Sequence, residues 1–401
     1  MGLFKKFLKT ISILIVSYFV LMTLIMIPSN SLTRTNASES LELIQTEGTY
    51  PEILDTSSKT GTRIDNFTDG WMVSATVKKQ SNPIVAAMSI NHYERYWQGY
   101  LIFLRPLMAF FNLSSIRYFS LFISMILFAL TFYVIAKSIN LVIALFYAVA
   151  MTSISFFIIP MCLEYSSLLY ILNLSVLYIL VKRKLPNTLL IFCVIGSLVN
   201  FFDFLTYPVI TLGIPLALLL IKKHYQDNGS SFQENIKTTS LAVLGWFSSY
   251  SITWLAKWCL ATLILQKNVI VDAVNQVLLR SEGTSSEAIS SNNPVLHRPF
   301  MLKENVLQIF TKQFILIFII ILIALIILAV INKISFSTMI SLSPMIFVAV
   351  LPYIWYLVLG NHSQVHYWMT YRAQAVFVFT SLSYAYLCIN NKRNSEKLKQ
   401  F

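Results

Sequence analysis

The chain has 401 residues, of which 56% are hydrophobic and only 12% are charged, and its formal net charge is +13. An average soluble domain has roughly 25% charged residues, so this composition excludes an ordinary water-soluble fold. The basic residues stand in short clusters between apolar segments rather than along one face, which argues against a nucleic-acid partner.

The apolar segments predict transmembrane helices, because about twenty nearly uncharged residues suffice to cross a hydrocarbon core of roughly 30 Å. The first segment, near 7–27, is longer than the apolar region of a cleaved signal peptide and lacks a small-residue cleavage site, which favours an uncleaved signal anchor. We predict an all-α polytopic integral membrane protein, a single membrane domain over 1–401. Its remaining spans, about ten with the first, fall near 118–136, 140–159, 166–182, 188–204, 207–221, 238–262, 313–331, 337–359 and 373–390.

The distribution of Lys and Arg predicts the orientation in a cell membrane. With both termini in the cytoplasm, the short inner segments carry clusters such as Lys182-Arg183-Lys184, whereas the short outer loops carry no Lys or Arg before Arg372. This agrees with the positive-inside rule. Two long outer loops follow, at 28–117 and 263–312, and the first contains an aromatic stretch, Tyr96–Pro106, that suits an interfacial helix.

Candidate catalytic acids lie in the first outer loop. Asp65 and Asp69 are four residues apart and would share a helical face, where either can act as a base at the membrane boundary. The alternative is that they are an N-cap and a first-turn acid of a helix. Arg63, Glu94 and Arg95 of the same loop are candidate substrate-binding residues.

Other ionisable residues stand close to apolar spans. Asp203 lies in a tight turn between two spans, where a functional and a structural role are both open, and Glu164 on the neighbouring outer turn is interpreted as a solvated loop acid. Lys257 lies inside a predicted span. It either extends to the interface or pairs with an acid or a lipid phosphate.

The last outer loop, Gly360–Arg372, carries two histidines and an arginine. His362 and His366 are four residues apart, as zinc ligands can be, but no H-E-x-x-H motif or third ligand accompanies them, and we predict no metal site. Arg372 is a candidate anion ligand, because guanidinium binds phosphate oxygens through two parallel hydrogen bonds. The alternative is an ordinary contact with lipid headgroups.

Four segments together resemble bacterial membrane glycosyltransferases of the GT-C type: Arg63–Met72, Tyr96–Pro106, Asp203–Pro208 and Asn361–Arg372. The resemblance implies an enzyme that moves a sugar from a polyprenyl-phosphate carrier to a cell-envelope glycan on the outer face. It also implies a catalytic acid in the first outer loop. Asp69 or Asp65 would then be the base, and Arg372, His366, His362 and Lys257 would bind phosphate or sugar.

This chemistry needs few groups. The carrier phosphate is already a good leaving group, so one carboxylate can suffice, and the scheme requires no metal ion or other cofactor. The rival function is a transporter or flippase for lipid-linked saccharides, which would place charges at mid-membrane and breaks in paired helices. The unusual polar residues gather at one face instead, which favours an enzyme. A third alternative is a non-catalytic scaffold or sensor.

Overall fold

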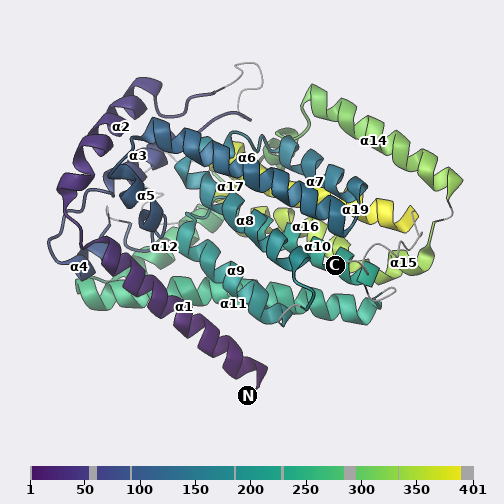
Figure 1. The fold of residues 1–401 in the computed structure, drawn as a ribbon, viewed down its shortest axis with the longest axis horizontal. Helices are drawn as coiled ribbons and strands as arrows, with labels where there is room; N and C mark the ends of the chain where they lie inside the picture. Colours follow the sequence, from purple (N-terminus) through teal and green to yellow (C-terminus); the bar gives the residue numbers. More distant parts are fainter. Residues whose placement is uncertain are drawn as a thin grey trace.

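The computed structural model of the chain describes residues 2–53, 61–90, 93–184, 187–226, 230–283, 295–332 and 334–389. Within these ranges the regular structure is helical, apart from one isolated antiparallel bridge between Glu52 and Arg63, so the predicted all-α class is confirmed. Long helices run side by side as a bundle, and most of the shorter helices lie at one end of it (Figure 1).

The bundle and its shorter helices alternate along the chain. The bundle consists of α1 (Leu3–Ile25), α6 (Leu113–Ser138), α7 (Leu141–Ser153), α8 (Leu163–Val181), α9 (Thr188–Phe202), α10 (Ile210–Gln226), α11 (Phe232–Leu265), α14 (Lys312–Ile331), α16 (Pro344–Val358) and α19 (Ala375–Ile389). The shorter helices are α2 (Arg34–Glu47), α3 (Asn66–Ser74), α4 (Pro83–Met88), α5 (Leu101–Met108), α12 (Val269–Glu282), α13 (Arg298–Leu307), α15 (Phe336–Ser341), α17 (Gly360–Val365) and α18 (Tyr367–Thr370).

Among the described residues, four helices are long and apolar enough to cross a membrane: α1, α6, α8 and α14. The expectation of about ten spans is therefore met only in part. Helices α7, α9 and α16 are apolar but have 13, 15 and 15 residues, and the predicted span 337–359 is divided between α15 and α16. Proline ends or kinks helices, and Pro344 begins α16.

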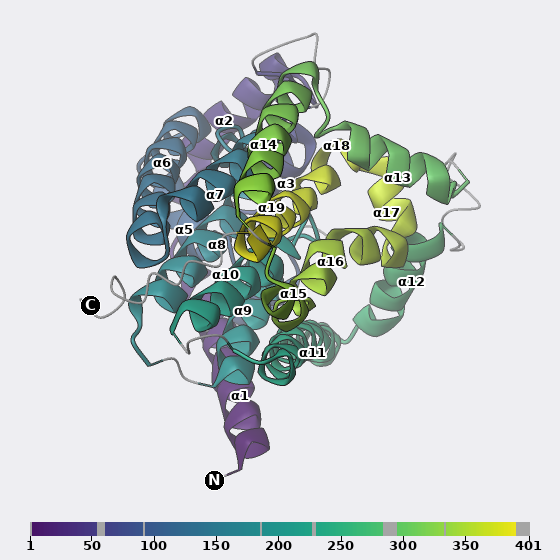
Figure 2. The same ribbon diagram turned by 90° about the vertical axis from the view of Figure 1, so that its right-hand side faces the viewer.

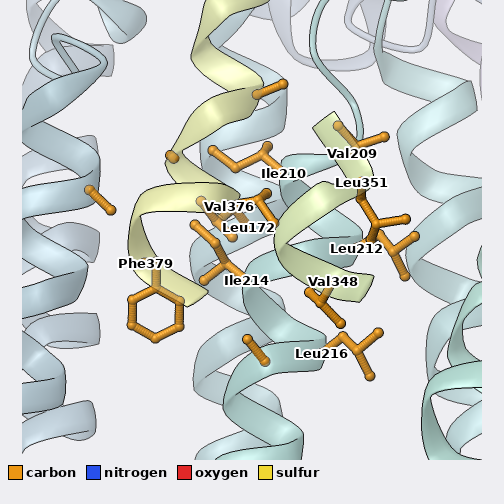
Figure 3. Close-up of a cluster of buried hydrophobic side chains, with 14 of the residues drawn as sticks. Leu172, Val209, Ile210, Leu212, Ile214, Leu216, Val348, Leu351, Val376 and Phe379 are labelled. Carbon is orange, nitrogen blue, oxygen red and sulfur yellow. The ribbon is translucent and has the colours of Figure 1, made fainter. Parts of the chain in front are cut away.

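The core of the bundle surrounds α10, which is buried along most of its length. Its side chains, among them Leu212 and Ile214, pack against Val348 of α16 and Val376 of α19 (Figure 3). Small residues let neighbouring backbones approach closely, as in other membrane bundles. A Cβ on Gly196 of α9 would lie 2.2 Å from the carbonyl oxygen of Trp246 on α11, so this close helix contact requires glycine.

Helix α14 lies at the edge of the bundle, where it packs against α19 (Figure 1), and in Figure 2 it runs in front of other helices. Its Ile, Leu and Phe side chains are exposed on most sides, and only Leu325 is buried. A helix that is apolar all round belongs in a hydrophobic surrounding rather than in water. This exposure is what a lipid-facing helix would have.

The turns between helices divide into two groups at opposite ends of the bundle. At one end, Lys222 Nζ donates to the carbonyls of Ile179 and Lys182, and Asn235 donates to the carbonyl of Ser341. At the other end lie α2 to α5 and α12 (Figure 1), and residues of α3, α12 and α17 line a cavity there.

Candidate functional site

A cavity of about 210 Å³ lies at the end of the bundle that carries the shorter helices. Its wall combines two acids, two histidines and one arginine with many aromatic rings. The lining residues are Tyr50, Asp65, Phe67, Thr68, Trp71, Met72, Tyr93, Tyr96, Gln98, Tyr100, Glu164, Phe204, Arg280, His362, His366 and Met369. They come from both long loops, from the starts of α3 and α8, and from α17.

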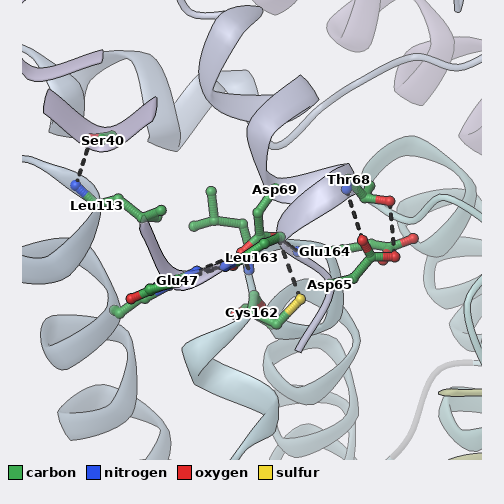
Figure 4. A network of polar contacts seen from close by, with 12 residues as sticks. Ser40, Glu47, Asp65, Thr68, Asp69, Leu113, Cys162, Leu163 and Glu164 are labelled. Atoms are coloured by element: carbon green, nitrogen blue, oxygen red, sulfur yellow. Dashed lines mark hydrogen bonds and ion pairs between the residues drawn. The ribbon is translucent and has the colours of Figure 1, made fainter. Parts of the chain in front are cut away.

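Asp65 and Glu164 form a carboxyl pair in this wall (Figure 4). Asp65 is the N-cap of α3 and accepts hydrogen bonds from the Thr68 N–H at 2.8 Å and the Thr68 hydroxyl at 3.1 Å. Glu164 lines the same wall, and its carboxyl interacts with that of Asp65. The two hydrogen bonds from Thr68 stabilise the charged form of Asp65.

Burial raises the pKa of Asp65 to about 6, while the Thr68 hydrogen bonds oppose this shift and the charge of Asp69 adds to it. A base is most effective when its pKa lies near the working pH. The interpretation of Glu164 as a solvated acid is wrong, because only 7% of this residue is exposed. A carboxyl in the first turn of a helix is easily taken for a surface group when only the sequence is known.

Asp69 has a different environment and does not line the cavity. It is fully buried and accepts hydrogen bonds from the backbone N–H groups of Leu163 at 3.0 Å and Glu164 at 3.2 Å. The Cys162 thiol donates to it as well, at 3.4 Å. Asp69 thus caps the start of α8 from another helix, where a negative charge is favourable. Burial raises the pKa of Asp69, and the charge of Arg117 opposes the shift.

Arg117 of α6 completes this buried network. Its guanidinium lies 3.6 Å from the Asp69 carboxylate, 2.7 Å from Glu47 of α2, and 2.6 Å from the Asn66 side-chain oxygen. It therefore joins α2, α3 and α6 to the start of α8. The sequence alone does not distinguish Arg117, because a lone arginine at the start of an apolar span is typical of an interfacial anchor.

His362 and His366 line the cavity together, with ring centroids 4.9 Å apart. His362 Nε2 lies 2.9 Å from the Leu205 carbonyl, which can only accept, so this nitrogen carries the proton and Nδ1 is an acceptor. Burial, aided by the charge of Arg280, lowers the pKa of His366 to about 4. The pKa of His362 is lowered as well, by burial first and then by His366 and Arg280. Both imidazoles are therefore neutral near pH 7.

Arg280 of α12 is the one Lys or Arg among the described lining residues. Its guanidinium lies 5.8 Å from the centre of the Tyr96 ring, and its Nη1 is buried with no hydrogen-bond partner in the described part of the chain. It is the cation best placed to bind an anion in the cavity. The sequence alone does not identify Arg280 as a site residue, because no neighbouring motif distinguishes it from other residues of the segment 263–312.

Two cations that were candidate ligands lie away from the cavity. Arg372 is fully buried, donates to the Trp368 carbonyl at 3.2 Å and packs over the Tyr165 ring at 4.8 Å. Lys257 Nζ lies 3.3 Å from the Ala87 carbonyl at the end of α4. Neither position is at a surface where headgroups would contact it, and neither residue lines the cavity. A ligand role for each stays a prediction.

The remaining candidates organise the loops around the cavity. Asp203 accepts hydrogen bonds from the N–H groups of Leu205 at 2.8 Å and Thr206 at 3.0 Å, which closes the turn that presents the Leu205 carbonyl to His362. Ion pairs join Glu94 to Lys267, Arg95 to Asp272 and Arg63 to Glu52, at 3.3, 3.2 and 3.3 Å. The first two of these pairs tie the first outer loop to the second.

No three His, Cys, Asp or Glu side chains of the described residues lie close enough together to hold a metal ion. Comparisons of the chain with models of known protein families, with curated proteins and with solved structures find no match. The residues that line the cavity therefore indicate its chemistry.

Proposed function

We propose that this chain is a membrane glycosyltransferase that moves a sugar from a polyprenyl-phosphate carrier to a cell-envelope glycan on the outer face. The observation that carries the proposal is a cavity that combines a carboxyl pair, Asp65 and Glu164, with one free guanidinium, Arg280, and two neutral imidazoles. A base and an anion ligand are the two groups that transfer from a lipid phosphate needs.

In the proposed reaction, the Asp65 carboxylate takes the proton from an acceptor hydroxyl. The acceptor oxygen then bonds to the anomeric carbon of the sugar, and the bond between that carbon and the phosphate oxygen breaks. The carrier phosphate leaves with the bonding electrons, and Arg280 stabilises its growing negative charge. His362 Nδ1 accepts a hydrogen bond from a sugar hydroxyl, which helps to orient the ring.

We further propose that α7, α9, α10, α11, α16 and α19 join the four candidate spans in a membrane domain of about ten helices. The cavity would then face the outside, with both termini in the cytoplasm. Two observations support this orientation. The segments assigned to the outer side meet at the cavity, and the Lys-bearing turns meet at the other end. With the exposed Cys259 replaced by Ser, an impermeant thiol reagent should not label Arg183→Cys in intact cells, and labelling there would overturn the orientation.

Transfer by the purified protein in detergent tests the reaction itself. A radiolabelled sugar on a polyprenyl phosphate should appear on an envelope-glycan acceptor when wild-type protein is added. A transporter or flippase would leave the donor unchanged, because detergent removes the two compartments that such a protein connects. The same preparation in sealed vesicles should move label across the bilayer only if the rival function is correct.

A further inference from the structure

Helix α12 has the exposure pattern of a helix in a membrane surface. Its outward side chains are Ile270, Val271, Val274 and Leu278, which are between 39% and 53% exposed. Two of its charged side chains contact the protein instead: Asp272 pairs with Arg95, and Arg280 lines the cavity, whereas Glu282 at the end of the helix is exposed. A helix in water has the reverse arrangement, with apolar residues inward and charges outward.

A second outer-loop helix of the same length provides the comparison. Helix α2 also has 14 residues, but its exposed face is polar and includes Arg34, Ser38 and Glu42. Its buried residues are the small Ala37 and Ser40. The two helices belong to the two long loops of the same end of the bundle, so their opposite exposure indicates two different surroundings.

Exposed apolar side chains also occur on α11, the bundle helix that precedes α12. Helix α12 begins shortly after the end of α11 and packs against it, and Leu255 and Leu263 of α11 are 50% and 67% exposed. A 14-residue helix is about 21 Å long, too short for a hydrocarbon core of roughly 30 Å. It therefore suits the boundary between headgroups and acyl chains.

We propose that α12 lies in the outer interface of the bilayer, with Ile270, Val271, Val274 and Leu278 in contact with lipid acyl chains. Its opposite face forms part of the cavity wall through Arg280, so α12 separates the cavity from the lipid by the width of one helix. An amphiphilic ligand can then keep its polar part in the cavity while its chain stays in the membrane. The location of α12 does not depend on sugar transfer.

The test places a fluorescent thiol probe at Val274→Cys or at Glu42→Cys in the full chain. Cys259 is exposed and is replaced by Ser, whereas Cys162, Cys193 and Cys388 are buried. The protein is reconstituted in phosphatidylcholine vesicles that contain lipids with nitroxides at shallow acyl positions. These lipids should quench the Val274→Cys probe and shift its emission to the blue. Aqueous iodide should quench the Glu42→Cys probe.

Two results would overturn the proposal. Strong iodide quenching at Val274→Cys would mean that the apolar face meets water. Loss of quenching by both reagents at Val274→Cys, with normal quenching at Glu42→Cys, would mean that another protein surface covers the face. The detergent transfer assay is read separately, so inactive protein with lipid quenching at Val274→Cys would reject the proposed function alone.

Discussion

Asp65 and Asp69 stand four residues apart near the start of α3, yet their carboxyls meet different partners. Asp65 pairs with Glu164 in the wall of the cavity, whereas Asp69 is enclosed by the N–H groups that begin α8. Each acid thus has a separate role: the first can meet a substrate and the second holds the helix that positions Glu164. Their variants should differ accordingly.

Asp65→Asn should lower transfer by roughly a hundredfold or more, because the amide cannot take a proton from the acceptor. Asn is a good N-cap and can still accept from the Thr68 N–H, so α3 should persist. The measurement is the initial rate of transfer in detergent, with elution from a sizing column as the control for folding. Wild-type rates in a well-folded Asp65→Asn protein would remove the base from this position.

Asp69→Ala should instead destabilise the protein. Removing one partner of a buried ion pair typically costs about 3–5 kcal/mol, and the N–H groups of Leu163 and Glu164 would lose their acceptor. Arg117→Ala should act through the same network, so the double variant should lose less than the two single losses combined. Thermal unfolding in detergent measures this, with the exposed Glu42→Ala as a control. Strict additivity would show that the two residues act independently.

The pH dependence of transfer should report Asp65. Because its pKa is raised to about 6, kcat/KM should fall about tenfold per unit below that pH and level off above pH 7. The raised pKa of Asp65 affects the free energy of unfolding with the opposite pH dependence. An acid with a folded pKa above its ordinary value of 3.8 adds stability fully below pH 3.8, and this stability is lost as the pH rises to about 6. A loss of activity at pH 5 would therefore reflect protonation of Asp65, and not unfolding caused by this group.

Matched variants of Arg280 and Arg372 test which of the two arginines binds the carrier phosphate. Methionine approximates the length of the arginine stem but has no charge, and replacing a buried ionic group by an apolar one is often tolerated. Arg280→Met should lower turnover strongly, because the cavity loses its cation. Arg372→Met should retain transfer, since Arg372 contacts Trp368 and Tyr165 instead. The opposite result in rates measured against donor concentration would restore Arg372 as the ligand.

The sequence predicted the helical class and the alternative of an N-cap and a first-turn acid for Asp65 and Asp69, because hydropathy and short-range spacing depend on neighbours in the chain. It did not predict which buried charged side chains hydrogen bond to backbone groups at the ends of helices. Lys222 and Asp69 lie at the two ends of α8, and Lys257 lies at the end of α4, although all three come from distant segments. Such contacts depend on tertiary packing, which also explains why Arg280 was missed and Glu164 was misinterpreted.

One predicted span is divided in the structure, for a related reason. Hydropathy measures how apolar a segment is, whereas a helix also ends where its backbone hydrogen bonds find other partners. In the segment predicted to span 337–359, the 3₁₀-like turn at Leu342 and Ser343 separates α15 from α16. A sequence window averages over such a turn and reports one continuous segment.

Mass spectrometry of the cell-envelope glycan tests the central claim most directly. Cells that lack the gene should lose one sugar substituent from the glycan, wild-type protein should restore it, and Asp65→Asn expressed at the same level should not. Arg372→Met serves as the matched variant that should restore it. A glycan that keeps every substituent without the gene would contradict the proposed transfer.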